Sequence, residues 1–130
     1  ENLKSITGTA QYEVNKLSAE LGNADVELVR KELGTEFDMI VHEPDGILEI
    51  GQAGHSKASG IERLCASLGI AKEDTYAFGD SANDVEMLEF VAHGIAMGNG
   101  TDVAKNAAEF VTTDIHKDGI WNGLKHYGLI

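Results

Sequence analysis

The chain has 130 residues, of which 42% are hydrophobic, and its formal net charge is −12 at pH 7. A chain this acidic argues against a nucleic-acid backbone or an anionic membrane surface as a partner, because both would repel it. No apolar stretch approaches the roughly 20 residues that a membrane-spanning helix needs, and no charged-then-apolar leader opens the chain, so we expect no signal peptide. Cys65 is the only cysteine, which excludes an internal disulfide and favours a cytoplasmic protein.

Residues 1–52 combine strand and helix patterns in the predicted order β-α-β-β. The helix is predicted over Val26–Leu33, with Asn23 or Asp25 as its N-cap and Gly34 as its stop. Strands are predicted near residues 12–17, over 37–41 and over 47–50, and the last two are joined by the turn sequence Pro44-Asp45-Gly46.

Helices and strands alternate after residue 52, which is typical of a parallel sheet with right-handed crossovers. The first helix is predicted over Lys57–Leu68, with Ser56 or Ser59 as its cap and Gly69 as its stop. Cys65 shares an apolar face of this helix with two leucines, so we expect it to be a small core residue. Strands are then predicted over 75–78, 94–97 and 110–112, and helices over 83–91, 102–108 and 120–127. We therefore divide the chain into domains of residues 1–52 and 53–130.

Residues 79–88, Gly-Asp-Ser-Ala-Asn-Asp-Val-Glu-Met-Leu, lie where a predicted strand ends and a helix begins. Open α/β sheets bind ligands at that edge, helix N-termini there favour anions, and paired carboxylates suit Mg²⁺. The alternative is that Asp80, Asn83 and Asp84 only cap the helix. Lys57, about one crossover upstream, predicts by itself no more than a solvated lysine in the first turn of a helix.

Residues 79–88 strongly resemble the last motif of the haloacid dehalogenase-like (HAD) phosphatases, Gly-Asp-x-x-Asn-Asp-x-x-Met-Leu. The segment that starts Lys57-Ala-Ser-Gly resembles the lysine motif of that family, and residues 94–108 and 118–120 are also typical of it. The resemblance covers about residues 36–130 and points to the Cof-type sugar phosphatases. It implies an α/β fold in which residues 53–130 form the C-terminal half of a HAD-like core, the C-terminal part of a Rossmann-like parallel sheet. Residues 1–52 would be the trailing part of an α/β cap domain.

The resemblance also implies a reaction and a role for each motif residue. The reaction is Mg²⁺-dependent hydrolysis of small phosphomonoesters, above all sugar phosphates, through an aspartyl-phosphate intermediate. Asp80 would coordinate Mg²⁺, and Asn83 would contact the phosphate or orient a ligand. Asp84 would support the water shell of the metal or Lys57. Lys57 would be catalytic, binding phosphoryl oxygens and offsetting the repulsion between carboxylates.

The nucleophile motif of the family, Asp-x-Asp-Gly-Thr, does not occur in these 130 residues. Residues 39–48 look like a degraded copy, but Glu43 replaces the nucleophile and Ile47 replaces the threonine, so a hairpin turn of the cap is favoured. We therefore expect the C-terminal portion of a phosphatase, inactive by itself. The missing N-terminal part of the same protein, or a partner chain, should cover the open edge of the strand that begins at Thr75 and ends at Phe78.

Two other functions stay open. A decayed HAD fold could serve as a non-catalytic binding or interaction module, which the absent nucleophile favours and the intact motif residues disfavour. A P-type ATPase phosphorylation domain shares the Gly-Asp-x-x-Asn-Asp block, but no membrane helix is predicted here, and the hairpin before Lys57 does not suit that family.

Overall fold

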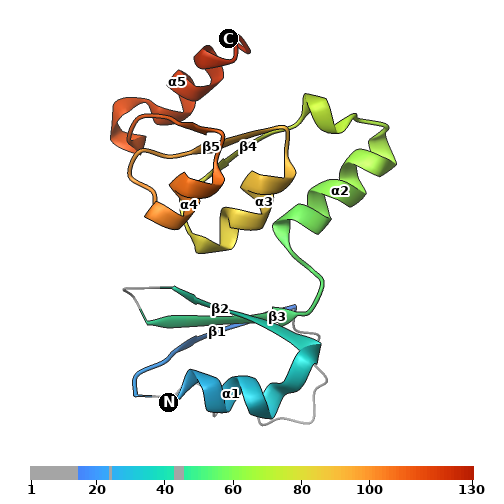
Figure 1. Cartoon of the computed structure of the whole chain (residues 1–130), viewed down its shortest axis with the longest axis vertical. Helices are drawn as coiled ribbons and strands as arrows, with labels where there is room; N and C mark the ends of the chain where they lie inside the picture. The colour runs from blue at the N-terminus through green and yellow to red at the C-terminus, as the bar shows by residue number, and fades with distance from the viewer. Residues whose placement is uncertain (1–14, 24, 43–45) are drawn as a thin grey trace. The chain divides into compact units, whose positions relative to one another are not determined.

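The computed structural model describes residues 15–23, 25–42 and 46–130. Its internal contacts divide the chain into two compact units, Glu1–Gln52 and Ala53–Ile130 (Figure 1). The assignment of the first unit to a cap and of the second to a core stays a prediction. The start of the strand predicted near residues 12–17, together with Glu43, Pro44 and Asp45, lies outside the described residues. None of the helices within the described ranges is long and apolar enough to cross a bilayer.

In its described residues, the first unit contains one helix and three strands, in the order β1 (Lys16–Glu20), α1 (Val26–Leu33), β2 (Phe37–His42) and β3 (Ile47–Gln52). A short 3₁₀ turn, η2 (Gly34–Glu36), follows the helix. The strands form an antiparallel sheet in the order β1-β3-β2. Asp25 starts α1 by accepting the backbone N–H groups of Glu27 and Leu28 at 3.0 and 3.2 Å. The predicted β-α-β-β order is confirmed.

The second unit alternates helices and strands. Its elements are α2 (Lys57–Leu68), η3 (Lys72–Asp74), β4 (Tyr76–Gly79), η4 (Ala82–Asp84), α3 (Val85–Phe90), β5 (His93–Ala96), α4 (Asp102–Ala107), β6 (Phe110–Val111), η5 (Ile115–Lys117) and α5 (Gly119–His126). The strands form a parallel sheet in the order β4-β5-β6. The predicted α/β fold class and parallel sheet are confirmed. The helix predicted from residue 83 differs locally, because residues 82–84 form a 3₁₀ turn before α3.

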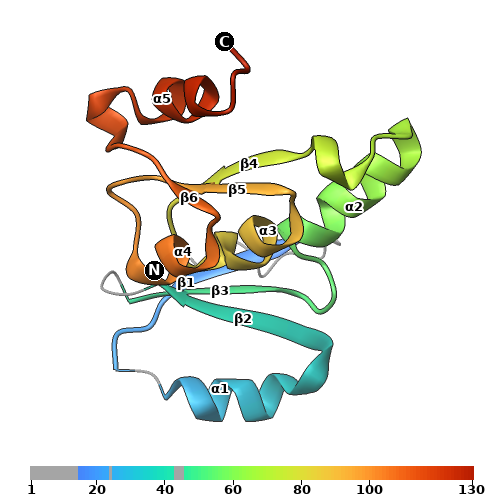
Figure 2. The ribbon, with the colours of Figure 1, turned by 45° about the horizontal axis from the view of Figure 1, so that its top comes forward.

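Helices cover both faces of the parallel sheet, and glycines let them approach it closely. A Cβ atom on Gly94 would lie 2.3 Å from the carbonyl oxygen of Leu88 in α3, and a Cβ atom on Gly123 in α5 would lie 2.5 Å from the ring of Phe78. A Cβ on Gly123 would also lie 3.4 Å from Ile95, which points to the opposite face of β5 from Gly94. α3 and α5 therefore pack on opposite faces of the sheet, as Figure 2 shows, and Ile95 between them is fully buried.

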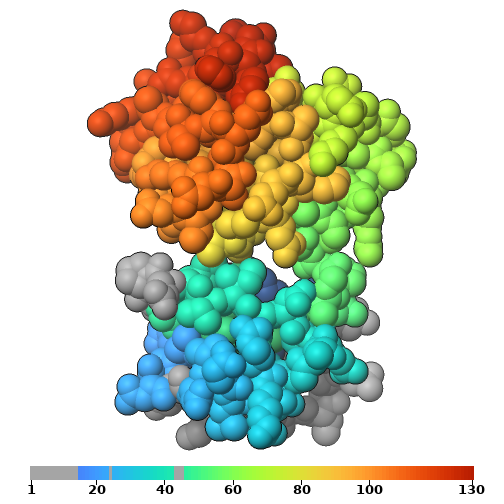
Figure 3. Space-filling view, in the orientation of Figure 1, coloured from blue at the N-terminus to red at the C-terminus, as the bar shows by residue number. Residues whose placement is uncertain are grey.

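The apolar face of α2 stays open within the described residues. α2 packs on α3, which packs in turn on α4, and Figure 3 shows the atoms of these helices as one continuous surface of the second unit. Leu64 and Leu68 are 57% and 63% exposed, and Cys65 is half-buried. The prediction that Cys65 is a core residue is therefore wrong, because the described chain leaves the helix face that it shares with these leucines uncovered.

Candidate functional site

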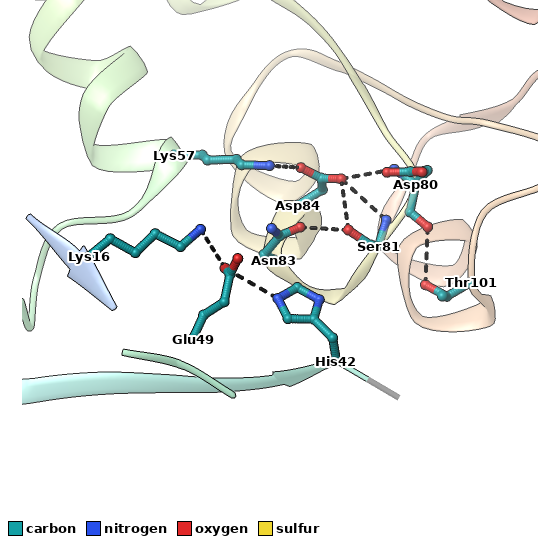
Figure 4. Close-up of polar contacts among 9 residues, drawn as sticks. All are labelled: Lys16, His42, Glu49, Lys57, Asp80, Ser81, Asn83, Asp84 and Thr101. Carbon is teal, nitrogen blue, oxygen red and sulfur yellow. Dashed lines mark hydrogen bonds and ion pairs between the residues drawn. The ribbon is translucent and has the colours of Figure 1, made fainter. Parts of the chain in front are cut away.

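The candidate site lies at the carboxyl edge of the parallel sheet, where the chain leaves β4 and turns into η4. Asp80 is the first residue after β4, and its main chain is held on both sides (Figure 4). Its N–H donates to Oδ2 of Asp84 at 2.9 Å, and its carbonyl oxygen accepts the N–H of Thr101 at 2.8 Å and the Thr101 hydroxyl at 3.3 Å. Asp80 is thus fixed through its backbone while it remains exposed to solvent.

Asp84 is the buried carboxylate of the site, with a side chain only 6% exposed. Its Oδ1 accepts a hydrogen bond from Nζ of Lys57 at 2.5 Å, and its Oδ2 accepts the N–H groups of Asp80 and Ser81 at 2.9 and 3.2 Å. Burial by itself would raise the pKa of Asp84, but the hydrogen bonds from Lys57 and from the two N–H groups outweigh it and hold the pKa below its ordinary value. Asp84 is therefore an ionised structural anchor for the turn after β4.

Lys57 reaches Asp84 because α2 begins at this edge of the sheet. Ser56 caps α2 in a reciprocal pair: its hydroxyl accepts the N–H of Ser59 at 3.3 Å, and the Ser59 hydroxyl accepts the N–H of Ser56 at 3.0 Å. Lys57 is the next residue, so the cap fixes where its side chain starts. The side chain remains 49% exposed, and a lysine ammonium has two N–H groups besides the one that donates to Asp84.

Asn83 lies in η4, and its amide oxygen faces a hydroxyl of the same turn. Oγ of Ser81 donates to Oδ1 of Asn83 at 2.6 Å. Within the described residues, neither the amide nitrogen of Asn83 nor the carboxylate of Asp80 has a hydrogen-bond partner. The structure therefore brings the four predicted site residues together through Asp84 and Ser81, and it leaves one amide donor and one carboxylate free for a ligand.

A magnesium ion fits only part of this site. Among the described residues, no group of three or more His, Cys, Asp or Glu side chains is placed to hold a metal ion. The Asp84 carboxylate is occupied by Lys57 and two N–H groups, so Asp80 is the carboxylate that remains. Mg²⁺ is commonly bound through one or two carboxylates, with waters and substrate phosphate completing the shell. Asp80 can supply one such ligand, and further ligands must come from elsewhere.

The capping alternative can now be tested for each acidic or amide residue. The N-cap of η4 is Ser81, so a capping role for Asp80 is wrong, and Asn83 lies inside the turn. Asp84 does act in part as a cap, because its carboxylate accepts the N–H of Ser81. Capping therefore explains the presence of Asp84 but not of Asp80 or Asn83.

Two residues that organise the site were not predicted from the sequence. The Ser81 hydroxyl donates to the amide oxygen of Asn83. The Thr101 hydroxyl donates to the carbonyl of Asp80 and makes no side-chain capping bond to the helix that follows it. A hydroxyl directly after Asp80 was a usable signal for Ser81. No local pattern signals the Thr101 contact, because it joins residues 21 positions apart.

Comparison with known proteins assigns the chain to a family. The sequence model of the haloacid dehalogenase-like hydrolases matches residues 2–124. An uncharacterized protein from the pdhA 5′ region of Geobacillus stearothermophilus is 54% identical over 78 residues, which cover 60% of this chain and 82% of that protein. The 5-amino-6-(5-phospho-D-ribitylamino)uracil phosphatase YitU of Bacillus subtilis is 42% identical over 84 residues, which cover 65% of this chain and 31% of YitU.

A solved structure agrees with this assignment. The HAD subclass IIB sugar phosphatase BT4131 matches with a TM-score of 0.82 and 31% identity, over 92% of this chain and 45% of that protein. The match spans only 31% to 43% of the length of three curated Bacillus subtilis phosphatases.

Proposed function

This chain belongs to the haloacid dehalogenase-like hydrolases, and from that membership we propose that it is the C-terminal portion of a Mg²⁺-dependent phosphatase of the Cof-type branch. The observation that carries the proposal is the pair of free groups at the carboxyl edge of the sheet. The carboxylate of Asp84 is hydrogen-bonded to Lys57 and to backbone N–H groups. The Asp80 carboxylate and the Asn83 amide nitrogen have no hydrogen-bond partner within the described residues. A free carboxylate and a free donor beside a half-exposed ammonium suit a hydrated cation and a phosphate.

The proposed role of each side chain follows from which of its polar groups have no partner in the protein. Asp80 supplies a carboxylate ligand to Mg²⁺, which when bound neutralises phosphate charge. Asn83 donates its amide N–H to a phosphate oxygen, and Lys57 offers the open side of its ammonium to the same group. Asp84 holds Lys57 and the turn in place and reaches the metal at most through water.

The nucleophile of the proposed reaction is an aspartate that these 130 residues do not contain in an Asp-x-Asp-Gly-Thr motif. Its carboxylate oxygen would attack phosphorus and displace the substrate alcohol, and water would then hydrolyse the acyl phosphate. We propose that this aspartate lies in an N-terminal part of the same protein, or in a partner chain, which covers β4. Two features support this: β4 pairs only with β5 within the described residues, and Leu64 and Leu68 on α2 are exposed.

The proposed substrates are small phosphorylated metabolites, with sugar phosphates first among them. The support is by similarity, since YitU acts on a phosphorylated ribityl compound and BT4131 is a sugar phosphatase by their names. The net charge of −12 supports neither nucleic acid nor an anionic membrane as a partner. A single cysteine is consistent with the cytoplasm as the proposed location.

The test is to compare the full-length protein encoded by this gene with the 130-residue chain. We expect the full-length protein to hydrolyse p-nitrophenyl phosphate and a panel of sugar phosphates only when Mg²⁺ is present, and we expect no appreciable turnover by the chain alone. A full-length protein that binds but never hydrolyses these compounds would favour the second candidate, a non-catalytic HAD-like module. Enzyme-like turnover by the isolated chain would show that its nucleophile has been misidentified as absent.

A further inference from the structure

We propose that Ser81 is a positioning residue: its hydroxyl fixes the side-chain amide of Asn83 with the NH₂ group turned outward, toward a phosphate. The inference rests on the proposed function, because it gives Ser81 a part in presenting Asn83 to the ligand. The observation behind it is the 2.6 Å contact between Oγ of Ser81 and Oδ1 of Asn83. Figure 4 shows the amide oxygen as the end of Asn83 that faces Ser81.

The hydrogen-bonding surroundings of Ser81 select one orientation of that amide. An amide oxygen only accepts, so in the observed orientation the Ser81 hydroxyl must donate to it. In the flipped orientation the NH₂ group would donate to Oγ, and the hydroxyl proton would need another acceptor. The nearest acceptor within the turn is Oδ2 of Asp84, at 3.5 Å from Oγ, a distance too long for a good O–H···O bond, and this oxygen already accepts two N–H groups. In the observed orientation the Ser81 hydroxyl proton therefore has a good acceptor within the turn, whereas in the flipped orientation it is left to the distant Asp84 oxygen or to solvent.

The backbone of Ser81 is tied to the buried carboxylate of the site. Its N–H donates to Asp84, which is anchored by Lys57, and its backbone is extended, with φ of −139° and ψ of 176°. The hydroxyl is therefore held relative to the same buried carboxylate that fixes Asp80. Phosphate oxygens accept but do not donate, so an amide that presents its oxygen to them would repel rather than bind. Fixing the amide removes that unproductive orientation.

The experiment uses two substitutions of equal size in the full-length protein, Ser81→Thr and Ser81→Val. Both β-branched side chains suit the extended backbone of residue 81, and only threonine keeps the hydroxyl. We expect Ser81→Thr to stay within about twofold of wild-type kcat/KM. Ser81→Val should lose about five- to tenfold, the value of one net hydrogen bond. The Mg²⁺ concentration for half-maximal activity and the thermal unfolding midpoint should be the same in both variants.

A second arm places both substitutions in an Asn83→Ala background, where Thr and Val should have equal activity because there is no amide left to orient. Equal activity of Thr and Val in the wild-type background would overturn the proposal, and so would a Val defect that persists without Asn83. If the wild-type protein proves inactive, the proposed function fails separately. In that case the test is the NMR chemical shift of the Asn83 side-chain amide in the 130-residue chain. We expect Ser81→Val to change this shift and Ser81→Thr to leave it unchanged. The same shift in both variants would overturn the positioning role.

Discussion

The two ends of the parallel sheet carry polar networks in different settings: contacts between element ends at the amino end, and a strand-to-helix turn at the carboxyl end. At the amino end, Oε2 of Glu109 accepts the hydroxyl of Tyr127 at 3.1 Å and lies 2.9 Å from Nδ1 of His93, whose ring stacks on Tyr76 with centroids 4.6 Å apart. These contacts fasten the end of α5 to the starts of the strands. This network is structural.

At the carboxyl end the network is just as connected but stops short of two groups. Lys57, Asp84 and the N–H groups of the turn satisfy one another, while the Asp80 carboxylate and the Asn83 NH₂ group have no partner among the described residues. Polar groups without a hydrogen-bond partner in the protein are expected where a ligand completes the network. This edge is where parallel sheets bind ligands. The difference between the two ends separates residues that hold elements together from residues that face a ligand.

The largest effect on stability should come from Asp84. Asp84→Ala leaves the N–H groups of Asp80 and Ser81 unsatisfied and removes the partner of Lys57, so we expect the free energy of unfolding to fall by about 2–3 kcal/mol. Asp80→Ala should change it by no more than about 0.5 kcal/mol. Urea denaturation of the 130-residue chain measures the free energy of unfolding of both variants. Equal losses in the two variants would mean that Asp80 has a structural role that its contacts do not show.

The decrease in stability at acidic pH should depend on Asp84 as well. Because its pKa is lowered in the folded state, the unfolded chain binds more protons once the pH falls below the ordinary aspartate value of about 4, and stability then falls with pH. This contribution is fully present above that value and is lost as the pH drops through the lowered pKa. Asp84→Asn, which cannot be protonated, should flatten the acid limb of a plot of thermal midpoint against pH. An unchanged slope would contradict the assignment of Asp84 as an ionised anchor.

The smallest effect is expected at the amino end, on Tyr127. Burial first, and then the hydrogen bond to Glu109, raise the pKa of Tyr127 to about 12. The folded state therefore keeps this proton longer than the unfolded chain, and the stability that it contributes is lost as pH rises from about 10 through 12. Ultraviolet titration should show one late tyrosine transition that Tyr127→Phe removes, with no change in the acid limb. A variant whose alkaline titration matches the wild type would show that Tyr127 is not fastened to Glu109.

The sequence predicted the features that depend on neighbouring residues. Ser56 and Gly69 bound α2 as expected, since capping and left-handed glycine geometry are local. The strand-to-helix turn after β4 was also placed correctly, because an apolar run followed by Gly-Asp marks it. For the site, the sequence could predict that the two motifs lie close together but not which atoms make contact. The Lys57–Asp84 pair joins residues 27 positions apart, and its form depends on how α2 packs.

Burial was predicted less well than secondary structure. The periodicity of α2 shows an apolar face but not what covers it, and Leu64, Cys65 and Leu68 lie on a face that the described chain leaves open. Ser81 was missed for a different reason: its role depends on side-chain orientation within one turn, which residue types alone do not determine. The ligand-facing role of Asp80, in contrast, depends on a carboxylate directly after a strand and stays a prediction until it is tested.

The central claim is that Asp80 faces a metal ion rather than the protein, and Asp80→Asn in the full-length protein tests it most directly. The amide keeps the size of the side chain, and no described contact of that side chain is lost, so the thermal midpoint should not change. Phosphatase activity measured against Mg²⁺ concentration should fall by about a hundredfold or more, since the metal's charge stabilisation is worth several kcal/mol. Near-wild-type turnover with an unchanged Mg²⁺ dependence would remove Asp80 from the metal site and contradict the account.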